Sequence, residues 1–240
     1  MRNYIVLILC VSILLVSCRF MGSERISGSG NSGTEDRNIG SFSGVETVGS
    51  LDVIVLQGAT HAVRIEGDDN LLEYVETELD GDVLEIRPRR GYNLRPRAGL
   101  KIYATAPYFD KLSVTGSGKI TSQSKITAPQ KISVEITGSG DIQADVDAPE
   151  VSSEVTGSGT VRLKGTTKKF TTEISGSGDT FAWDLLSEDA KVEIAGSGNV
   201  QLFASKKLDI EIAGSGDIQY KGNPAVSTSK AGSGNVRKVD

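Results

Sequence analysis

Five glutamates recur at near-constant spacing, each three residues before a Gly-Ser-Gly triplet. They are Glu135, Glu154, Glu173, Glu193 and Glu211. If the repeats stack, these carboxylates form a row with spacings near 5 Å (about the distance between paired strands), where like charges repel unless a cation or a proton intervenes. The row predicts either a weak stripe for Ca²⁺ or another cation, or a solvated acidic face offset by nearby lysines. The solvated face is the simpler interpretation.

A second cluster is basic. It contains Arg87, Arg89, Arg90, Arg95 and Arg97. No acidic residue lies between positions 87 and 109, and the run also carries Tyr92. Such a run predicts a loop that binds anionic sugars or lipid headgroups. The alternative is a solvated loop whose arginines pair with the acidic repeats.

Composition limits the catalytic chemistry that the chain could perform. His61 is the only histidine, so a Ser-His-Asp triad would have to use it and a site with several histidines cannot form. The net charge of -5 argues against nucleic acid as a partner. Few aromatic residues argue against a haem or flavin pocket. We therefore expect neither an enzyme nor a cofactor.

The N-terminus indicates the compartment. A positive residue, Arg2, precedes an apolar run from Tyr4 to Leu15, which is typical of a secretory signal and too short to span a bilayer. The run ends in Leu15-Val16-Ser17-Cys18, which resembles a bacterial lipobox. The resemblance implies cleavage before Cys18 and lipidation of this cysteine, and thus a membrane anchor. Arg19, in place of Asp, favours sorting to the outer membrane, and which membrane face the protein occupies stays open.

The most informative feature is a repeat of Gly-Ser-Gly. The triplet stands at 116–118, 138–140, 157–159, 176–178, 196–198, 214–216 and 232–234. A period of ~20 residues indicates a solenoid or an array. Apolar residues alternate through the triplet with one parity, which places both glycines inward and the serine outward. Phe181 and Trp183 break this parity and predict an outward loop or a bulge.

Aspartate or asparagine often follows the triplet, as at Asp141, Asp179, Asn199 and Asp217. A calcium-binding nonapeptide repeat would need a glycine turn about every nine residues, and here one occurs per ~20. Short side chains that cap their own turn explain the bias more simply. Upstream of the repeat, short alternating runs between glycines predict strands, and residues 70–79 predict a helical turn.

Units of the form Ile212-Ala213-Gly214-Ser215-Gly216-Asp217-Ile218, together with Phe42-Ser43-Gly44-Val45 and Tyr220-Lys221-Gly222-Asn223-Pro224, resemble the auto-transporter adhesin, head GIN domain family, which is common in lipoproteins of Bacteroidota. The resemblance covers about residues 25–238. It implies an all-β fold, a right-handed parallel β-helix-like solenoid with ~20-residue Gly-Ser-Gly coils.

These features predict three segments. Residues 1–17 are a lipoprotein signal peptide, residues 18–41 carry the lipidated Cys18 and a Gly/Ser-rich tether, and residues 42–240 form one solenoid domain. The alternative for the Gly/Ser-rich segment is that part of it is the first, irregular turn of the fold. Within the domain, 42–110 is irregular and 111–240 holds the regular repeats. We expect a lipid-anchored envelope protein with a non-catalytic binding, adhesin-like or structural role, its partners being the membrane and a glycan or another envelope protein. The alternatives are a polysaccharide-acting β-helix enzyme and an envelope-stress accessory protein acting through a partner.

Overall fold

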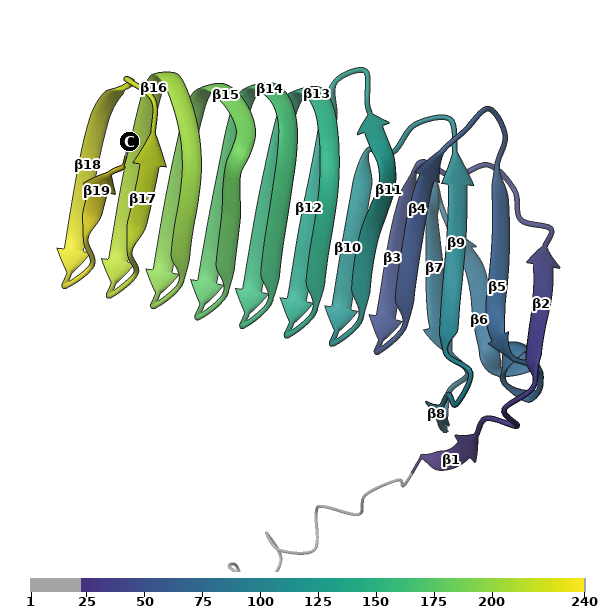
Figure 1. Ribbon diagram of the computed structural model, residues 1–240. Coiled ribbons are helices and arrows are strands. Elements are labelled where there is room, and N and C mark those ends of the chain that lie inside the picture. Colours follow the sequence, from purple (N-terminus) through teal and green to yellow (C-terminus); the bar gives the residue numbers. More distant parts are fainter. Residues whose placement is uncertain (1–22, 240) are drawn as a thin grey trace, which may run out of the picture.

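The computed structural model describes residues 23–239. The predicted signal peptide and Cys18 lie outside the described residues. Within the described range, no helix is both long and apolar enough to span a bilayer. The fold is nearly all β, as predicted, and the coils stack in parallel into a solenoid of about 7 turns (Figure 1).

The first part of the chain consists of nine strands and one 3-10 helix. These elements are β1 (Glu24–Ser27), β2 (Ser32–Arg37), β3 (Gly44–Gly49), β4 (Asp52–Gln57), β5 (Ala62–Asp68), η1 (Asp69–Tyr74), β6 (Val75–Asp80), β7 (Val83–Pro88), β8 (Tyr92–Arg95) and β9 (Leu100–Ala106). The predicted helical turn over 70–79 is right only in its first half, because Val75 to Asp80 pair with β7 as an antiparallel strand.

The second part is the regular stack. Its strands are β10 (Lys111–Gly116), β11 (Lys119–Thr127), β12 (Lys131–Gly138), β13 (Asp141–Gly157), β14 (Thr160–Gly176), β15 (Asp179–Gly196), β16 (Asn199–Gly214), β17 (Ile218–Lys221), β18 (Ala225–Gly232) and β19 (Val236–Lys238). Each coil lies parallel to the next with the triplets in register, as Gly138 opposite Gly157 and Gly157 opposite Gly176 show.

The stack continues into the part predicted as irregular. β10 pairs in parallel with β3, and β11 pairs with β4, so Gly49 occupies the same corner as Gly116. β9 and β7 extend the stack by one more layer. Beyond this layer, antiparallel pairing begins, between β2 and β5 and between β5 and β9. These antiparallel strands cover the N-terminal edge of the sheet, which would otherwise offer free backbone groups to another chain.

The Gly/Ser-rich segment predicted as a tether through residue 41 belongs to the fold over most of its described length. β2 pairs with β5 along its whole length, and β1 pairs with β8. A Cβ at Gly28 would lie 2.3 Å from the side chain of Asp68, so this glycine allows a close approach. The correction has a physical reason: glycine here permits packing and does not indicate a free chain.

The core follows the alternation read from the sequence. In the coil before the second triplet, Ile132, Val134 and Ile136 are fully buried or nearly so. The second glycine of each triplet is buried and the serine between the glycines is exposed, as predicted, whereas the first glycine is half-buried in the central coils.

The two glycines of a triplet are required for different reasons. Gly157 has φ +122°, and a Cβ there would lie 2.4 Å from the carbonyl oxygen of Gly138 in the preceding coil. That oxygen also accepts a hydrogen bond of 2.8 Å from the Ser158 amide. At Gly159, a Cβ would meet the Ile136 side chain at 2.5 Å. The first glycine thus permits the backbone corner, and the second leaves room for the core.

We predict that Gly157→Ala lowers the free energy of unfolding by about 1–3 kcal/mol, because the new methyl group forces the corner apart in an unfavourable region of φ. Ser158→Ala, which removes only an exposed hydroxyl, should change it by less than about 0.5 kcal/mol. Urea titration of both variants checks this. Equal losses at the two positions would contradict the assignment of the corner.

Candidate functional site

The predicted glutamate row exists. Glu135, Glu154, Glu173, Glu193 and Glu211 are direct partners in successive parallel pairings. The row continues through Ser113 to Glu46 and Glu85 on the N-terminal strands. Sequence spacing located the members inside the repeat, but it missed Glu46 and Glu85 because these strands join the stack out of chain order.

Lysines flank the glutamate row. Lys111 forms an ion pair of 2.8 Å with Glu135, and Lys191 pairs with Glu193. A neighbouring row of side chains alternates in charge, since the ammonium groups of Lys131 and Lys169 lie 3.4 and 3.6 Å from the Glu150 carboxylate. Among the described residues, no group of three or more His, Cys, Asp or Glu side chains is placed to hold a metal ion. These contacts favour the solvated acidic face over the cation stripe.

The glutamate row raises the pKa of the lysines that contact it. The hydrogen bond from Lys111 to Glu135 raises the pKa of this lysine although burial opposes the rise, and the charges of Glu135, Glu46 and Glu154 add to it. The pKa of Lys191 rises for the same reason, first through its hydrogen bond to Glu193. Each lysine therefore compensates the charge of several carboxylates of the row.

The Asp/Asn positions after the triplet act between coils. Asp179 Oδ1 accepts hydrogen bonds from the backbone amide and the Nδ2 of Asn199, at 3.0 and 2.9 Å. Asp217 accepts the same two bonds from Asn235. The expectation that these side chains cap their own turn is wrong at these positions, because stacking brings the amide of the next coil within reach.

The arginine cluster divides in two. Arg87 is half-buried and forms ion pairs with Glu76, Glu78 and Glu85, so it belongs to the β6–β7 pairing. Arg89 donates to the Glu73 carbonyl oxygen and lies over the Tyr74 ring. The carboxylate partners of the two arginines come from β6 and β7, not from the regular coils.

The exposed arginines of the cluster lie beside β1, the first described strand. Arg89, Arg90, Arg95 and Arg97, which we call the basic pole, are all exposed and border or belong to β8. β8 pairs with β1, Glu24 opposite Tyr92 and Ser27 opposite Arg95. The basic pole therefore lies beside the first described strand, away from the C-terminus (Figure 1).

Asp68 holds the basic pole to the fold. Its fully buried carboxylate accepts hydrogen bonds from the backbone amides of Gly30, Arg97 and Ala98, at 2.6, 2.8 and 3.0 Å. Burial acts to raise the pKa of Asp68, but these hydrogen bonds outweigh it and hold the pKa below its ordinary value. His61 is likewise structural: its ring packs against Phe42, with Nε2 3.1 Å from the Phe42 carbonyl oxygen.

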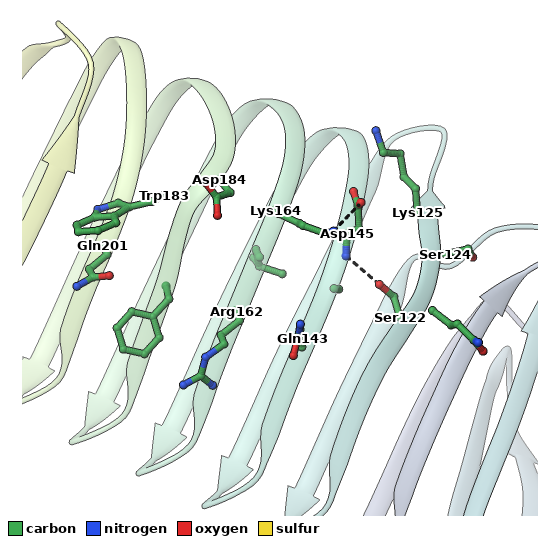
Figure 2. A pocket seen from close by; sticks show the side chains of 14 residues that line it. Ser122, Ser124, Lys125, Gln143, Asp145, Arg162, Lys164, Trp183, Asp184 and Gln201 are labelled. Carbon is green, nitrogen blue, oxygen red and sulfur yellow. Dashed lines mark hydrogen bonds and ion pairs between the residues drawn. The ribbon is translucent and has the colours of Figure 1, made fainter. Parts of the chain in front are cut away.

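One groove on the outer face of the solenoid was not expected as a site. It has a volume of about 400 Å³ and crosses the strands from β11 to β16. Figure 2 shows Ser122, Ser124 and Lys125 at one end and Trp183 and Gln201 at the other. Side chains of β13 and β14 form its floor, among them Gln143, Asp145, Arg162 and Lys164.

Two bulges make this flank groove. From Thr121 to Lys125, β11 has five residues where β13 has three. Between Ala182 and Leu186, β15 spends five residues against two on β16. The extra residues leave the regular alternation and raise side chains above the flat face on both sides. The broken parity at Phe181 and Trp183 signalled the second bulge. The extra residues of the first bulge lie in the longest interval between triplets, the 22 residues from 116 to 138.

The groove contains aromatic and unpaired polar groups together. The Arg162 guanidinium lies 5.1 Å from the centre of the Phe181 ring, and the Lys221 ammonium lies 4.8 Å from that of Trp183. Asp145 Oδ1 and Trp183 Nε1 are shielded from water and have no hydrogen-bond partner among the described residues. Buried polar atoms without partners are uncommon in folded proteins.

A family model described as "Putative auto-transporter adhesin, head GIN domain" matches residues 41–224. The chain belongs to this family. The resemblance noted in the sequence is therefore confirmed. No curated protein matches the chain.

Solved structures resemble this head GIN domain along nearly their whole length. A putative adhesin from Bacteroides fragilis has a TM-score of 0.83 at 22% identity, covering 89% of this chain and 100% of that one. A putative lipid binding protein from Parabacteroides distasonis has a TM-score of 0.72 at 30% identity, covering 90% and 100%. A putative adhesin from the same species has a TM-score of 0.71 at 22% identity, with the same coverage.

We predict that Asp68→Asn loosens the basic pole, because the amide cannot accept all three backbone hydrogen bonds. A depressed pKa means that the stabilisation by Asp68 is present above the ordinary aspartate pKa of about 3.9 and is lost as pH falls through the lower folded value. The difference in urea stability between the two proteins should thus be constant above about pH 5 and shrink below about pH 4. Asp36→Asn, on an exposed aspartate of β2, is the control and should change little.

We also predict that Lys111→Gln lowers the free energy of unfolding by up to about 1 kcal/mol at pH 7, because three glutamates lose a shared counter-charge. A raised lysine pKa means that this contribution is complete below about pH 10 and declines only as pH rises through the folded value. Arg90→Gln, outside the row, serves as the control. An equal effect of the two changes would show that the row needs no specific counter-charge.

Proposed function

We propose that this head GIN domain is a lipid-anchored, non-catalytic binding protein of the bacterial cell envelope, with an adhesin-like role. The observation that carries the proposal is the pairing of β1 with β8. Because of it, the chain enters the fold beside the basic pole. A lipid on Cys18 would then hold this part of the solenoid closest to the bilayer.

The distance from the anchor supports this orientation. Cys18 precedes Ser23 by five residues, which span at most about 18 Å when fully extended. Lipidation at Cys18 would therefore keep Arg95 and Arg97 close to the headgroups. An arginine near an anionic surface contributes about 1 kcal/mol of attraction, so the basic pole would add to the anchor and orient the domain.

Binding is the role that the relatives' names support, since they are described as adhesins and a lipid binding protein. Arg19 after the modified cysteine supports sorting to the outer membrane. The polysaccharide-acting enzyme is the weaker alternative, because Asp145 in the groove lies 3.4 Å from Lys164 and is engaged in an ion pair.

We predict that Cys18→Ala leaves a larger precursor that takes up no radiolabelled palmitate, whereas the native protein is labelled and leaves the membrane with detergent but not with salt. Gel mobility and acyl labelling measure this. Normal labelling of Cys18→Ala would contradict the anchor.

The orientation has its own readout. For the lipidated protein in nanodiscs, amide exchange over residues 89–97 should be slower in phosphatidylglycerol than in phosphatidylcholine. Replacing Arg90, Arg95 and Arg97 by alanine should remove this difference. The charge-matched control replaces Lys230, Arg237 and Lys238 at the C-terminal end and should preserve it. Equal exchange in both lipids would contradict the orientation.

A further inference from the structure

We propose that the flank groove binds an oligosaccharide, laid across the strands between the two bulges. The inference rests on the binding role proposed above and names the class of ligand. The groove combines the two surfaces that a sugar chain presents, since sugar rings have apolar faces and a rim of hydroxyl groups. Phe181 and Trp183 contribute aromatic rings to the lining, and the floor contributes hydrogen-bonding side chains.

The length of the groove favours several linked rings over a single sugar. Its lining residues come from five successive strands, β11, β13, β14, β15 and β16. Neighbouring strands are spaced about 4.8 Å apart, so the groove extends over about 19 Å. The volume of about 400 Å³ lies within the range of roughly 300–1,000 Å³ found for ligand sites.

The polar groups of the floor fit neutral hydroxyls better than a strongly charged ligand. Gln143 and Gln201 each offer a donor and an acceptor. Charged side chains of both signs line the groove. Lys164 forms an ion pair with Asp145, and Asp184 stands opposite Lys164 in the pairing of β14 with β15. A phosphate group would meet both carboxylates, and a cation would meet Arg162 and the lysines.

Two other ligand classes fit less well. An acyl chain would desolvate the charged groups of the floor without replacing their hydrogen bonds to water, at a cost in free energy. A peptide strand would need free backbone groups at a sheet edge. The groove lies on the face of β13, β14 and β15, whose backbones are already paired with each other. A ligand here is recognised through side chains, and hydroxyl groups can both donate to and accept from them.

The regular coils explain why the site occurs here. Where the alternation is undisturbed, outward side chains form flat ladders of charged and small polar residues with no aromatic member. The bulges of β11 and β15 raise side chains above these ladders and enclose the groove between them. Gln57 of β4 holds the bulge of β11 in place. Ser124 Oγ accepts a hydrogen bond from the Gln57 backbone amide, and the Thr127 backbone amide donates one to Gln57 Oε1. This support keeps one end of the groove fixed.

The chain supplies its own probe, since Trp183 is the only tryptophan. The full-length lipidated protein, purified in detergent, is titrated with cellohexaose, maltohexaose, laminarihexaose, xylohexaose and chitohexaose while tryptophan emission is recorded. Glucose, myristate and inorganic phosphate are titrated in parallel. We expect a saturable change with at least one hexasaccharide, and a much weaker response to glucose.

Variants then locate the binding. Phe181→Ala and Gln143→Ala should weaken binding about tenfold or more, since each removes a stacking face or a polar partner. Tyr108→Ala and Gln219→Ala, an exposed aromatic residue and a glutamine outside the groove, should leave the affinity unchanged. By calorimetry, Trp183→Phe should retain more affinity than Trp183→Ala. Thermal unfolding of every variant confirms that the solenoid is intact.

The outcomes are distinct. No saturable response to any hexasaccharide, a response to myristate or phosphate alone, or equal losses in the groove and control variants would overturn the inference. None of these results bears on acylation of Cys18, so failure of the groove and failure of the anchor are told apart. Release of shorter sugars from a bound hexasaccharide would overturn the non-catalytic role and leave the groove as the binding site.

Discussion

The structure depends on one close approach, that of backbone to backbone at the corner of each coil. At Gly157 the nearest atom to a would-be Cβ is a carbonyl oxygen of the coil below, and the same contact recurs from Gly116 to Gly232. Parallel stacking demands that every coil turn at the same place, because any side chain there would push two coils apart. The triplet recurs along the chain for this reason.

Once the corners are aligned, every outward position becomes a ladder. A ladder of like charges is unfavourable unless the next ladder compensates it. The glutamate row is compensated by Lys111 and Lys191, and a neighbouring row alternates Lys131, Glu150 and Lys169. Asp179 and Asp217 use the same proximity to bind the asparagine of the next coil. On the outer faces of the regular coils, the charges of neighbouring ladders thus compensate one another.

Specific chemistry arises where the regularity is broken. The bulges of β11 and β15 enclose the flank groove, and the layer of β5 to β9 at the N-terminal end gathers the basic pole. Both features cost local regularity that the stack tolerates because the glycine corners on either side stay in register. The groove and the basic pole lie on different parts of the solenoid, so the two proposed contacts, with a membrane and with a sugar chain, would not compete for the same surface.

The sequence by itself determined the stack, because a solenoid repeats a local relation: the period of the triplets and the parity around them fix the inward residues, the corners and the glutamate row. It also signalled the bulge at Phe181 and Trp183. Only the tertiary structure decided that Arg87 forms ion pairs with Glu76, Glu78 and Glu85. It also decided that the Asp68 carboxylate binds the backbone amides of Gly30 and Arg97, and that β3 pairs with β10. These relations join residues far apart in the chain, and no period connects them. The groove could not be predicted from the sequence for the same reason. Ser122 and Trp183, at its two ends, lie about sixty residues apart in the chain and come together only because the coils between them stack.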